Sequence, residues 1–248
     1  KIYIELERQF HSDVQIIAET TKSSTQKARS NYRYSIKADT LMGNTISSRK
    51  IKVSPLLREF TKYHTSVEFV REVLWLFKDS LIRYRPDLLQ VLQNAVYSNG
   101  TALSASSNKY SNNIIRTEVE TVINSPVFEK ASSVRGYHHD KLNEIYAALL
   151  YMPKRGDRTP GGNFQILRCR QHCRKLPNNR ELKKKLGVAE IGRHEQYDPK
   201  NLELYREVAY RRNTLALFIN SPVSVHAVSV RPKSSFSRRY INVNADLK

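Results

Sequence analysis

The chain has 248 residues and a formal net charge of +19, with 40% hydrophobic and 26% charged residues. This hydrophobic fraction can form a core, which argues against a wholly disordered chain, and no apolar run approaches the length needed to span a bilayer. The N-terminus has no signal-peptide pattern, and the presence of only two cysteines makes a reducing cytoplasm the expected setting. The positive charge favours an anionic partner, either an anionic substrate or nucleic acid, but it carries no information about the fold.

The two cysteines, Cys169 and Cys173, are too few for a disulfide framework. The segment that they bound, Cys-Arg-Gln-His-Cys, has residue types that bind zinc, but one such cluster without a second half is a weak signal. We therefore expect two ordinary thiols in a reducing compartment.

Helical patterns occupy the first half of the chain. Residues up to about 50 are polar and predict no clear element. The pair Ser54-Pro55 is typical of a helix N-cap followed by the first helical residue, and apolar residues follow it at helical spacing. Ser66 begins a second, more apolar helix. Pro86 opens a third, which we expect to stop at Asn99-Gly100.

After about residue 110 the pattern changes to short runs rich in β-branched residues, separated by Pro, Gly, Asn and Asp. The expected strands cover residues 114–123, 145–152, 163–167, 208–210, 214–219, 223–230 and 239–243. Helices first and strands afterwards predict a single α+β domain over residues 1–248, in which a mainly helical support region, 1–110, braces a β-sandwich or barrel, 111–248. A basic insertion at about 168–193 is either a solvated loop or a substrate clamp, and both interpretations stay open.

The stretch Tyr-His-His-Asp, residues 137–140, carries the strongest chemical signal. In a strand, residues i and i+2 point to the same face, so His138 and Asp140 would project together and His139 would point away. One imidazole and one carboxylate make two thirds of the facial triad that binds non-haem Fe(II). His226 lies in an alternating stretch near the C-terminus, and two antiparallel strands could bring it beside the first pair.

A facial triad leaves three metal positions open, of which a bidentate 2-oxo acid takes two and O2 the third. The far carboxylate of the acid needs a cation, and Arg suits this role because its planar fork pairs with a carboxylate through two parallel hydrogen bonds. Arg238 and Arg239 follow His226 by about one strand and a turn. We expect their strand to run beside that of His226.

Taken in order, these motifs resemble the 2-oxoglutarate/Fe(II) dioxygenases of the prolyl-4-hydroxylase-like type, over roughly residues 115–245. Ser-Val-Arg-Gly-Tyr-His-His-Asp, 133–140, is similar to the His-x-Asp strand of that family, and Asp-Arg-Thr-Pro-Gly-Gly-Asn-Phe, 157–164, looks like its Gly-Gly turn. Residues 224–228 look like the distal-histidine region. Residues 237–242 look like the strand that bears the oxoglutarate-binding Arg.

The resemblance implies a double-stranded β-helix, or jelly-roll, core with iron ligands at His138, Asp140 and His226. It implies Fe(II), 2-oxoglutarate and O2 as cofactors, and Arg239 as the residue that binds the 2-oxoglutarate carboxylate, with Arg238 as the second choice. Asp140 favours hydroxylation, because halogenating relatives lack this carboxylate. The implied activity is hydroxylation of an unidentified substrate with release of succinate and CO2.

Two other functions stay open on the sequence alone. A basic β-domain could bind nucleic acid or another polyanion without catalysis, and its salt-sensitive binding would survive loss of His138 and Asp140. A metal-binding jelly roll without a 2-oxoglutarate requirement would be indifferent to Arg239. The sequence identifies neither the substrate nor the oligomeric state, because one fold hosts many chemistries.

Overall fold

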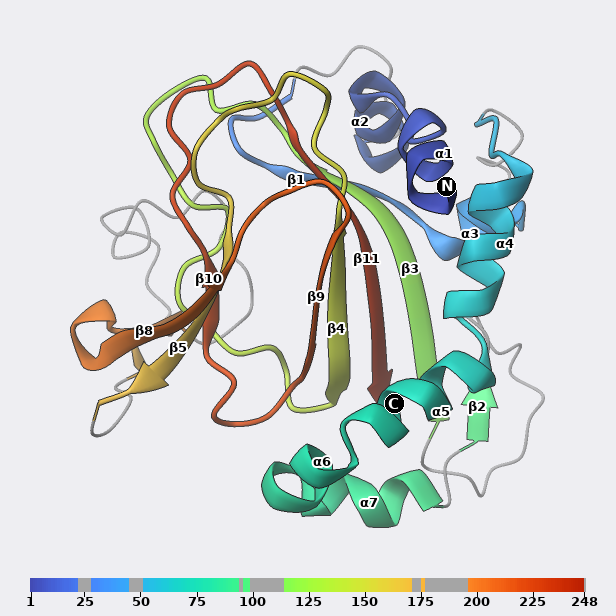
Figure 1. The fold of residues 1–248 in the computed structure, drawn as a ribbon, viewed down its shortest axis with the longest axis vertical. Coiled ribbons are helices and arrows are strands. Elements are labelled where there is room, and N and C mark those ends of the chain that lie inside the picture. Colours follow the sequence, from blue (N-terminus) through green and yellow to red (C-terminus); the bar gives the residue numbers. More distant parts are fainter. Residues whose placement is uncertain are drawn as a thin grey trace.

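The computed structural model of the chain describes residues 1–21, 28–44, 51–93, 96–98, 114–170, 175–176 and 196–247. Over these residues the fold is mixed α+β, with two main sheets and a set of helices packed against one of them (Figure 1). No helix in this part of the chain is long and apolar enough to cross a membrane.

The helices lie in the first part of the chain, as the sequence predicts. They are α1 (Ile2–Arg8), α2 (Asp13–Thr21), α3 (Ala38–Met42), α4 (Pro55–His64), α5 (Val67–Leu76), α6 (Lys78–Tyr84) and α7 (Pro86–Gln93). The predicted N-cap is confirmed, because Ser54 Oγ accepts a hydrogen bond from the Leu57 N–H at 3.1 Å. Ser66, predicted to begin the second helix, also caps it, and its Oγ accepts a hydrogen bond from the Phe69 N–H at 3.3 Å. Each cap satisfies an N–H that the start of a helix leaves without a partner. The predicted stop at Asn99-Gly100 lies outside the described residues.

The larger sheet forms the middle layer of the molecule. Its antiparallel strands run in the order β1 (Arg33–Lys37), β3 (Ile114–Asn124), β11 (Arg238–Leu247), β4 (Glu144–Tyr151) and β9 (Thr214–Ile219), and β2 (Val96–Ser98) joins β3 in parallel. Strand β1 was not predicted, because it is short and only Tyr34 and Ile36 are buried in it. The support region therefore contributes an edge strand to the sheet as well as helices.

The smaller sheet lies beside the larger one and is built from the second half of the chain. It has the antiparallel order β10 (His226–Val228), β5 (Phe164–Cys169) and β8 (Leu202–Val208), and β6 (Lys175–Leu176) pairs with β7 (Gln196–Tyr197). The strand expected at 208–210 is displaced towards the N-terminus, because the outer strand β8 is largely exposed and has no apolar alternation to reveal it.

The segment after β5 bears on two predictions. Most of the basic insertion, 168–193, lies outside the described residues. Cys169, at the end of β5, is in a disulfide, so the expectation of two ordinary thiols is wrong for this residue.

Two apolar cores separate the layers. Because successive side chains of a strand point to opposite faces, Ile241 and Val243 of β11 pack towards the helices, in the same core as Leu57 and Val70. A second core between the sheets includes Tyr240 of β11. Figure 1 shows α1 to α4 on one side of the large sheet, α6 and α7 beyond its lower end, and the small sheet on the other side. One face of the large sheet thus packs against the helices, and the other faces the space between the sheets.

Candidate metal centre

The three predicted metal ligands come together at the small sheet. His138, between β3 and β4, forms an isolated antiparallel bridge with His226 at the start of β10. The His138 N–H donates to the His226 carbonyl at 3.0 Å, and the His226 N–H donates to the His138 carbonyl at 2.7 Å. The predicted antiparallel approach of the two histidines is confirmed. Asp140 follows in irregular backbone, where the sequence predicted a strand, but its carboxylate still lies on the same side as the His138 ring.

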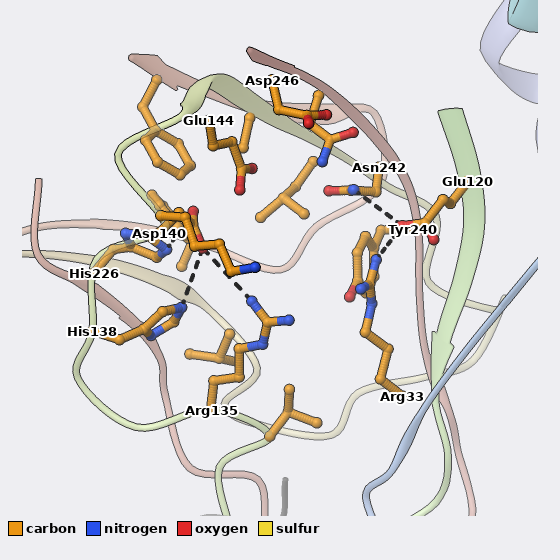
Figure 2. Close-up of a pocket in the computed structure, with 18 of the residues that line it drawn as sticks. Arg33, Glu120, Arg135, His138, Asp140, Glu144, His226, Tyr240, Asn242 and Asp246 are labelled. Atoms are coloured by element: carbon orange, nitrogen blue, oxygen red, sulfur yellow. Dashed lines mark hydrogen bonds and ion pairs between the residues drawn. The ribbon is translucent and has the colours of Figure 1, made fainter. Parts of the chain in front are cut away.

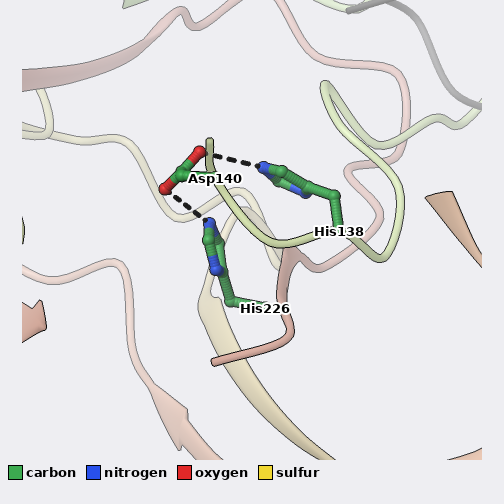
Figure 3. Close-up of side chains that lie close together, drawn as sticks. All are labelled: His138, Asp140 and His226. Carbon is green, nitrogen blue, oxygen red and sulfur yellow. Dashed lines mark ion pairs between the residues drawn. The ribbon is translucent and has the colours of Figure 1, made fainter. Parts of the chain in front are cut away.

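The three side chains converge on one point (Figure 3). Asp140 Oδ1 lies 3.6 Å from His138 Nε2, and Asp140 Oδ2 lies 3.3 Å from His226 Nε2. All three ligand atoms lie within 4.8 Å of one another, and all three residues are buried. Ligand atoms about 2.0–2.2 Å from a common ion are separated by roughly 3 Å when they share one face of it. The cluster can therefore hold one metal ion after a small contraction.

Hydrogen bonds at the far side of each ring fix which nitrogen faces the cluster. His138 Nδ1 lies 2.8 Å from the Gly136 carbonyl, and His226 Nδ1 lies 2.9 Å from the Ser224 carbonyl. A carbonyl oxygen only accepts, so each Nδ1 carries the proton and donates. Each Nε2 then presents its lone pair towards Asp140, which is the arrangement that outer hydrogen bonds give to metal-binding histidines.

The electrostatics of the cluster favour the protonation states that a metal requires. Burial, with a smaller contribution from His226, lowers the pKa of His138 to about 3, so its ring is neutral at physiological pH. Burial raises the pKa of Asp140, but the two histidines beside it, His226 above all, outweigh burial and hold that pKa well below its usual range. At physiological pH the set therefore offers a cation the neutral imidazole of His138 and the carboxylate of Asp140.

Packing and backbone hydrogen bonds hold the cluster in place. The His226 ring contacts Phe164 and Phe218, with ring centroids 5.3 Å and 4.8 Å away. The loop that follows Asp140 is tied down by Asn220, whose Nδ2 donates to the Lys141 carbonyl at 2.6 Å. These contacts restrict the ligands before any ion binds.

A cavity of about 550 Å³ opens from the cluster into the space between the sheets (Figure 2). His138, Asp140 and His226 line one part of it, and Arg238 lines another. The prediction that Arg238 or Arg239 lies near the triad is therefore correct for Arg238.

Arg238 is one of the most deeply buried charges in the fold, with 1% of its surface exposed. Its guanidinium donates to the Gly162 carbonyl at 2.7 Å, to Asn124 Oδ1 at 3.1 Å and to the Tyr151 hydroxyl at 3.1 Å. The Tyr151 and Tyr240 rings lie within 5 Å of its Cζ atom, at 4.9 Å and 4.7 Å. All these partners are neutral, and no carboxylate of the described residues forms an ion pair with Arg238. A buried positive charge of this kind lacks an anion.

Arg239, the first choice from the sequence, lies on the opposite face of the strand and does not line the cavity. Its Nη2 is 3.4 Å from the carbonyls of Phe10 and His11, and its Cζ atom lies 4.2 Å over the Phe10 ring. A shift of one residue along a strand reverses the face, so the choice between neighbouring arginines decides between the cavity and the helical layer. Of the two arginines, Arg238 therefore lines the cavity that contains the three candidate ligands, and Arg239 does not.

The strand that carries Arg238 also lies elsewhere than expected. Strand β11 pairs with β3 and β4 in the large sheet, and not beside β10. Between β10 and β11 the chain crosses from one sheet to the other, so Arg238 approaches the cavity from the layer opposite His226. This crossing lets one cavity contain residues from both sheets.

A glycine pair seats Arg238. Gly161 and Gly162 have positive φ values of 78° and 73°, which favour glycine. A Cβ atom on Gly162 would lie 3.1 Å from Arg238 Cδ and 3.3 Å from Arg231 Cδ. The Gly-Gly turn singled out in the sequence therefore lets two arginine side chains pass close to the backbone.

His139 points away from the cluster, as the i, i+2 argument predicts. It is buried, with its ring 5.6 Å from that of Tyr197 and its Nδ1 2.6 Å from the Asp140 carbonyl. Its position is that of a packing residue which helps to shape the backbone at Asp140.

Sequence reasoning missed several residues of the cavity, among them Arg33, Glu120, Arg135 and Glu144. A signal was present for Glu120, because it alternates with the apolar residues Val119 and Ile123, which lie on the core face of the same strand. No local signal marks Arg33, since its strand was not predicted.

The fold and the site define an α+β protein with a candidate two-histidine, one-carboxylate metal centre between two sheets. No protein-family model matches the chain, and neither a curated protein nor a solved structure matches it. Any functional assignment therefore depends on the motifs and on the geometry of this site.

Proposed function

We propose that the protein is a non-haem Fe(II), 2-oxoglutarate-dependent dioxygenase that hydroxylates its substrate and releases succinate and CO2. The observation that carries this proposal is a single cavity that joins the His138, Asp140 and His226 cluster to Arg238, a buried cation with neutral partners. The metal ligands and the anion-binding group that a 2-oxo acid needs are thus present together.

The ligand set alone leaves a choice of metal. Two histidines and a carboxylate bind catalytic zinc in some enzymes and Fe(II) in many oxygenases. Arg238 favours the oxygenase, because a dicarboxylate that chelates a metal through one end needs a cation for its other end. Bound Fe(II) would supply the activation of O2 that oxidation of a C–H bond requires.

The strand order supports a jelly-roll core for this oxygenase. From β3 onwards the chain visits the large sheet, the His138 segment beside β10, the large sheet at β4, the small sheet at β5 and β8, and then β9, β10 and β11 in alternation. Repeated crossing between two facing antiparallel sheets is the pattern of a jelly roll.

The protein's own residues have distinct tasks in this proposal. Arg238 binds and orients the far carboxylate through its fork, and the Tyr151 hydroxyl beside it adds a second polar contact. Tyr240 and Phe164 wall the cavity and keep water from the reacting end. Asp140 and the two histidines would hold the metal, and the cavity beside them would admit 2-oxoglutarate, O2 and the substrate.

Titration calorimetry with Mn(II), which resembles Fe(II) in size but supports no turnover here, tests the proposal. We expect the protein to bind Mn(II), and 2-oxoglutarate to bind measurably only after the metal. The proposal would be contradicted if 2-oxoglutarate bound with the same affinity without the metal and without the Arg238 side chain. If the protein instead bound polyanions in a salt-sensitive manner that Asp140→Ala leaves unchanged, the non-catalytic alternative would be favoured.

A further inference from the structure

The inner face of β11 is unusually polar for a strand between two sheets, where side chains ordinarily interdigitate as an apolar core. After Tyr240, the cavity-facing positions are Asn242, Asn244 and Asp246. The alternate positions of the same strand belong to the core against the helices. A polar face that lines a cavity is suited to binding a polar ligand.

The formal charges around the cavity cancel once the metal ligands and Arg238 are set aside. The remaining lining residues carry three cations and three acids: Arg33, Arg135, Lys141, Glu120, Glu144 and Asp246. The large positive charge of the whole chain therefore does not extend into this part of the cavity. A strongly anionic substrate would find no net attraction here beyond the metal and Arg238.

Two of the acids lie on the side of the cavity opposite the two arginines. Figure 2 shows Glu144 and Asp246 on one side of the cavity, and Arg33 and Arg135 on the other. Glu144 begins β4 and is the register partner of Asp246 on β11, so the acidic side is built by two adjacent strands of the large sheet. The cavity thus presents an electric dipole to a ligand.

One residue on each side has capacity to bind a ligand. Arg33 and Glu120 are paired directly with each other, and Asn242 lies 3.3 Å from Glu120. Arg135, by contrast, has 25% of its side chain exposed, and its ion pair with Asp140 is 3.7 Å long, which is longer than a hydrogen bond. Glu144 is half-buried, and no Lys or Arg of the described residues forms an ion pair with it. Burial, followed by the charge of Asp140, raises the pKa of Glu144 to about 8, and a cationic group bound beside it would favour its ionised form.

We propose, on the basis of the function proposed above, that this cavity binds a zwitterionic substrate, an α-amino acid or a small molecule with the same two charged groups. The carboxylate pairs with the Arg135 guanidinium, whose planar fork matches it. The ammonium group lies between Glu144 and Asp246. Because Arg135 also lies beside Asp140, a molecule held in this way has its carbon atoms next to the metal centre.

Calorimetric titration with free amino acids tests this inference. The protein is loaded with Mn(II) and 2-oxoglutarate, so that the site is complete but inactive, and each of the common amino acids is titrated in turn. We expect at least one to bind, and its analogues without the amine or without the carboxylate to bind at least tenfold more weakly. Absence of binding by every amino acid, or equal binding of the singly charged analogues, would overturn the inference.

Charge-removing variants locate the ligand. Arg135→Gln and Glu144→Gln should each weaken amino-acid binding at least tenfold, and Arg135→Lys should weaken it less than Arg135→Gln. The exposed residues of α4 give matched controls, Arg58→Gln and Glu59→Gln, which should bind as the unmodified protein does. Equal affinity in Arg135→Gln and its control would place the ligand elsewhere.

The failure of this inference and the failure of the oxygenase proposal give different results. The binding of Mn(II) and 2-oxoglutarate is measured first, and this result tests only the oxygenase proposal. The amino-acid titration is then repeated on metal-free protein, in which Arg135 and Glu144 are still present on the two sides of the cavity. Amino-acid binding without metal or 2-oxoglutarate binding would uphold the cavity and contradict the oxygenase, and the reverse would uphold the oxygenase and contradict the zwitterionic substrate.

Discussion

The two faces of β11 show how one strand serves stability and chemistry at once. Ile241 and Val243 point towards the helices and are buried among apolar side chains. Arg238 and Asn242, on the other face, line the cavity. Buried polar groups destabilise the fold unless they are paired, so this face contributes less to stability than an apolar face would. The comparison teaches that the outer face holds the fold together while the inner face is reserved for ligands.

The largest expected effect separates the metal centre from the rest of the inner face. Asp140→Ala removes the one anionic ligand, so we expect Mn(II) affinity to fall by more than the roughly 10–100-fold that loss of an outer-shell partner costs. The far-ultraviolet circular dichroism spectrum should not change. Asp79→Ala, at an exposed position of α6, is the control. Unaltered Mn(II) affinity in Asp140→Ala would remove the metal centre from the account.

Two adjacent arginines test the comparison most sharply, because they differ only in the face they occupy. Arg238→Met should weaken 2-oxoglutarate binding by roughly 30-fold or more, since loss of one partner of a buried charge pair costs about 2–5 kcal/mol. Arg239→Met should change that affinity less than about threefold and act on thermal stability through Phe10. Calorimetry on both variants gives the answer, and the opposite ranking would restore Arg239 as the binding residue.

The neighbours Ile241 and Asn242 allow the two faces to be compared by their effect on the free energy of unfolding. Ile241→Ala should lower the free energy of unfolding by about 2–5 kcal/mol, because it leaves a cavity in the core against the helices. Asn242→Ala should cost about 1 kcal/mol, the contribution of one hydrogen bond. Urea unfolding followed by circular dichroism measures both. A larger loss in Asn242→Ala would mean that the inner face is structural after all.

The smallest expected effect is a pH dependence at the inner face of β3. Burial raises the pKa of Glu118 to about 7, even though the Ala38 N–H donates to its carboxylate. A raised pKa favours the protonated group in the fold, so its contribution to stability is present below about pH 4.5 and is lost as the pH rises to about 7. Glu118→Gln keeps the acceptor for Ala38 and should gain about 1–2 kcal/mol relative to the unmodified protein over that interval.

Urea unfolding at several pH values detects the gain in Glu118→Gln. The exposed residue Glu203 provides a matched control, Glu203→Gln, which should follow the pH dependence of the unmodified protein. A constant difference between Glu118→Gln and the unmodified protein from pH 4.5 to pH 7.5 would contradict the raised pKa.

Much of the α+β fold could be predicted from local patterns. The serines that cap α4 and α5 and the alternation of β3, β4 and β9 are local signals, and the structure confirms them. Strands β1 and β8 were missed or displaced because they are edge strands, whose residues are held by a single neighbour and need little apolar alternation.

The metal cluster could be predicted because His138 and Asp140 are close in sequence, and because His226 lies on a strand with clear alternation. The sequence also carried a signal for which of the two arginines faces the cavity. In a strand, Arg239 lies on the same face as the apolar residue Ile241, whereas Arg238 lies on the same face as the polar residue Asn242. The pairing of Glu144 with Asp246 could not be foreseen, since it depends on the register between β4 and β11.

The central claim is that one cavity holds Fe(II) and 2-oxoglutarate between the His138 cluster and Arg238. Its most direct test is the anaerobic addition of Fe(II) and then 2-oxoglutarate to the purified protein, while the weak visible absorption of a 2-oxo acid chelated to Fe(II) is recorded. We predict an absorption band that needs both additions, disappears in Asp140→Ala, requires more 2-oxoglutarate in Arg238→Met and is unchanged in Arg239→Met. Absence of the band in the unmodified protein, with neither component bound by calorimetry, would contradict the claim.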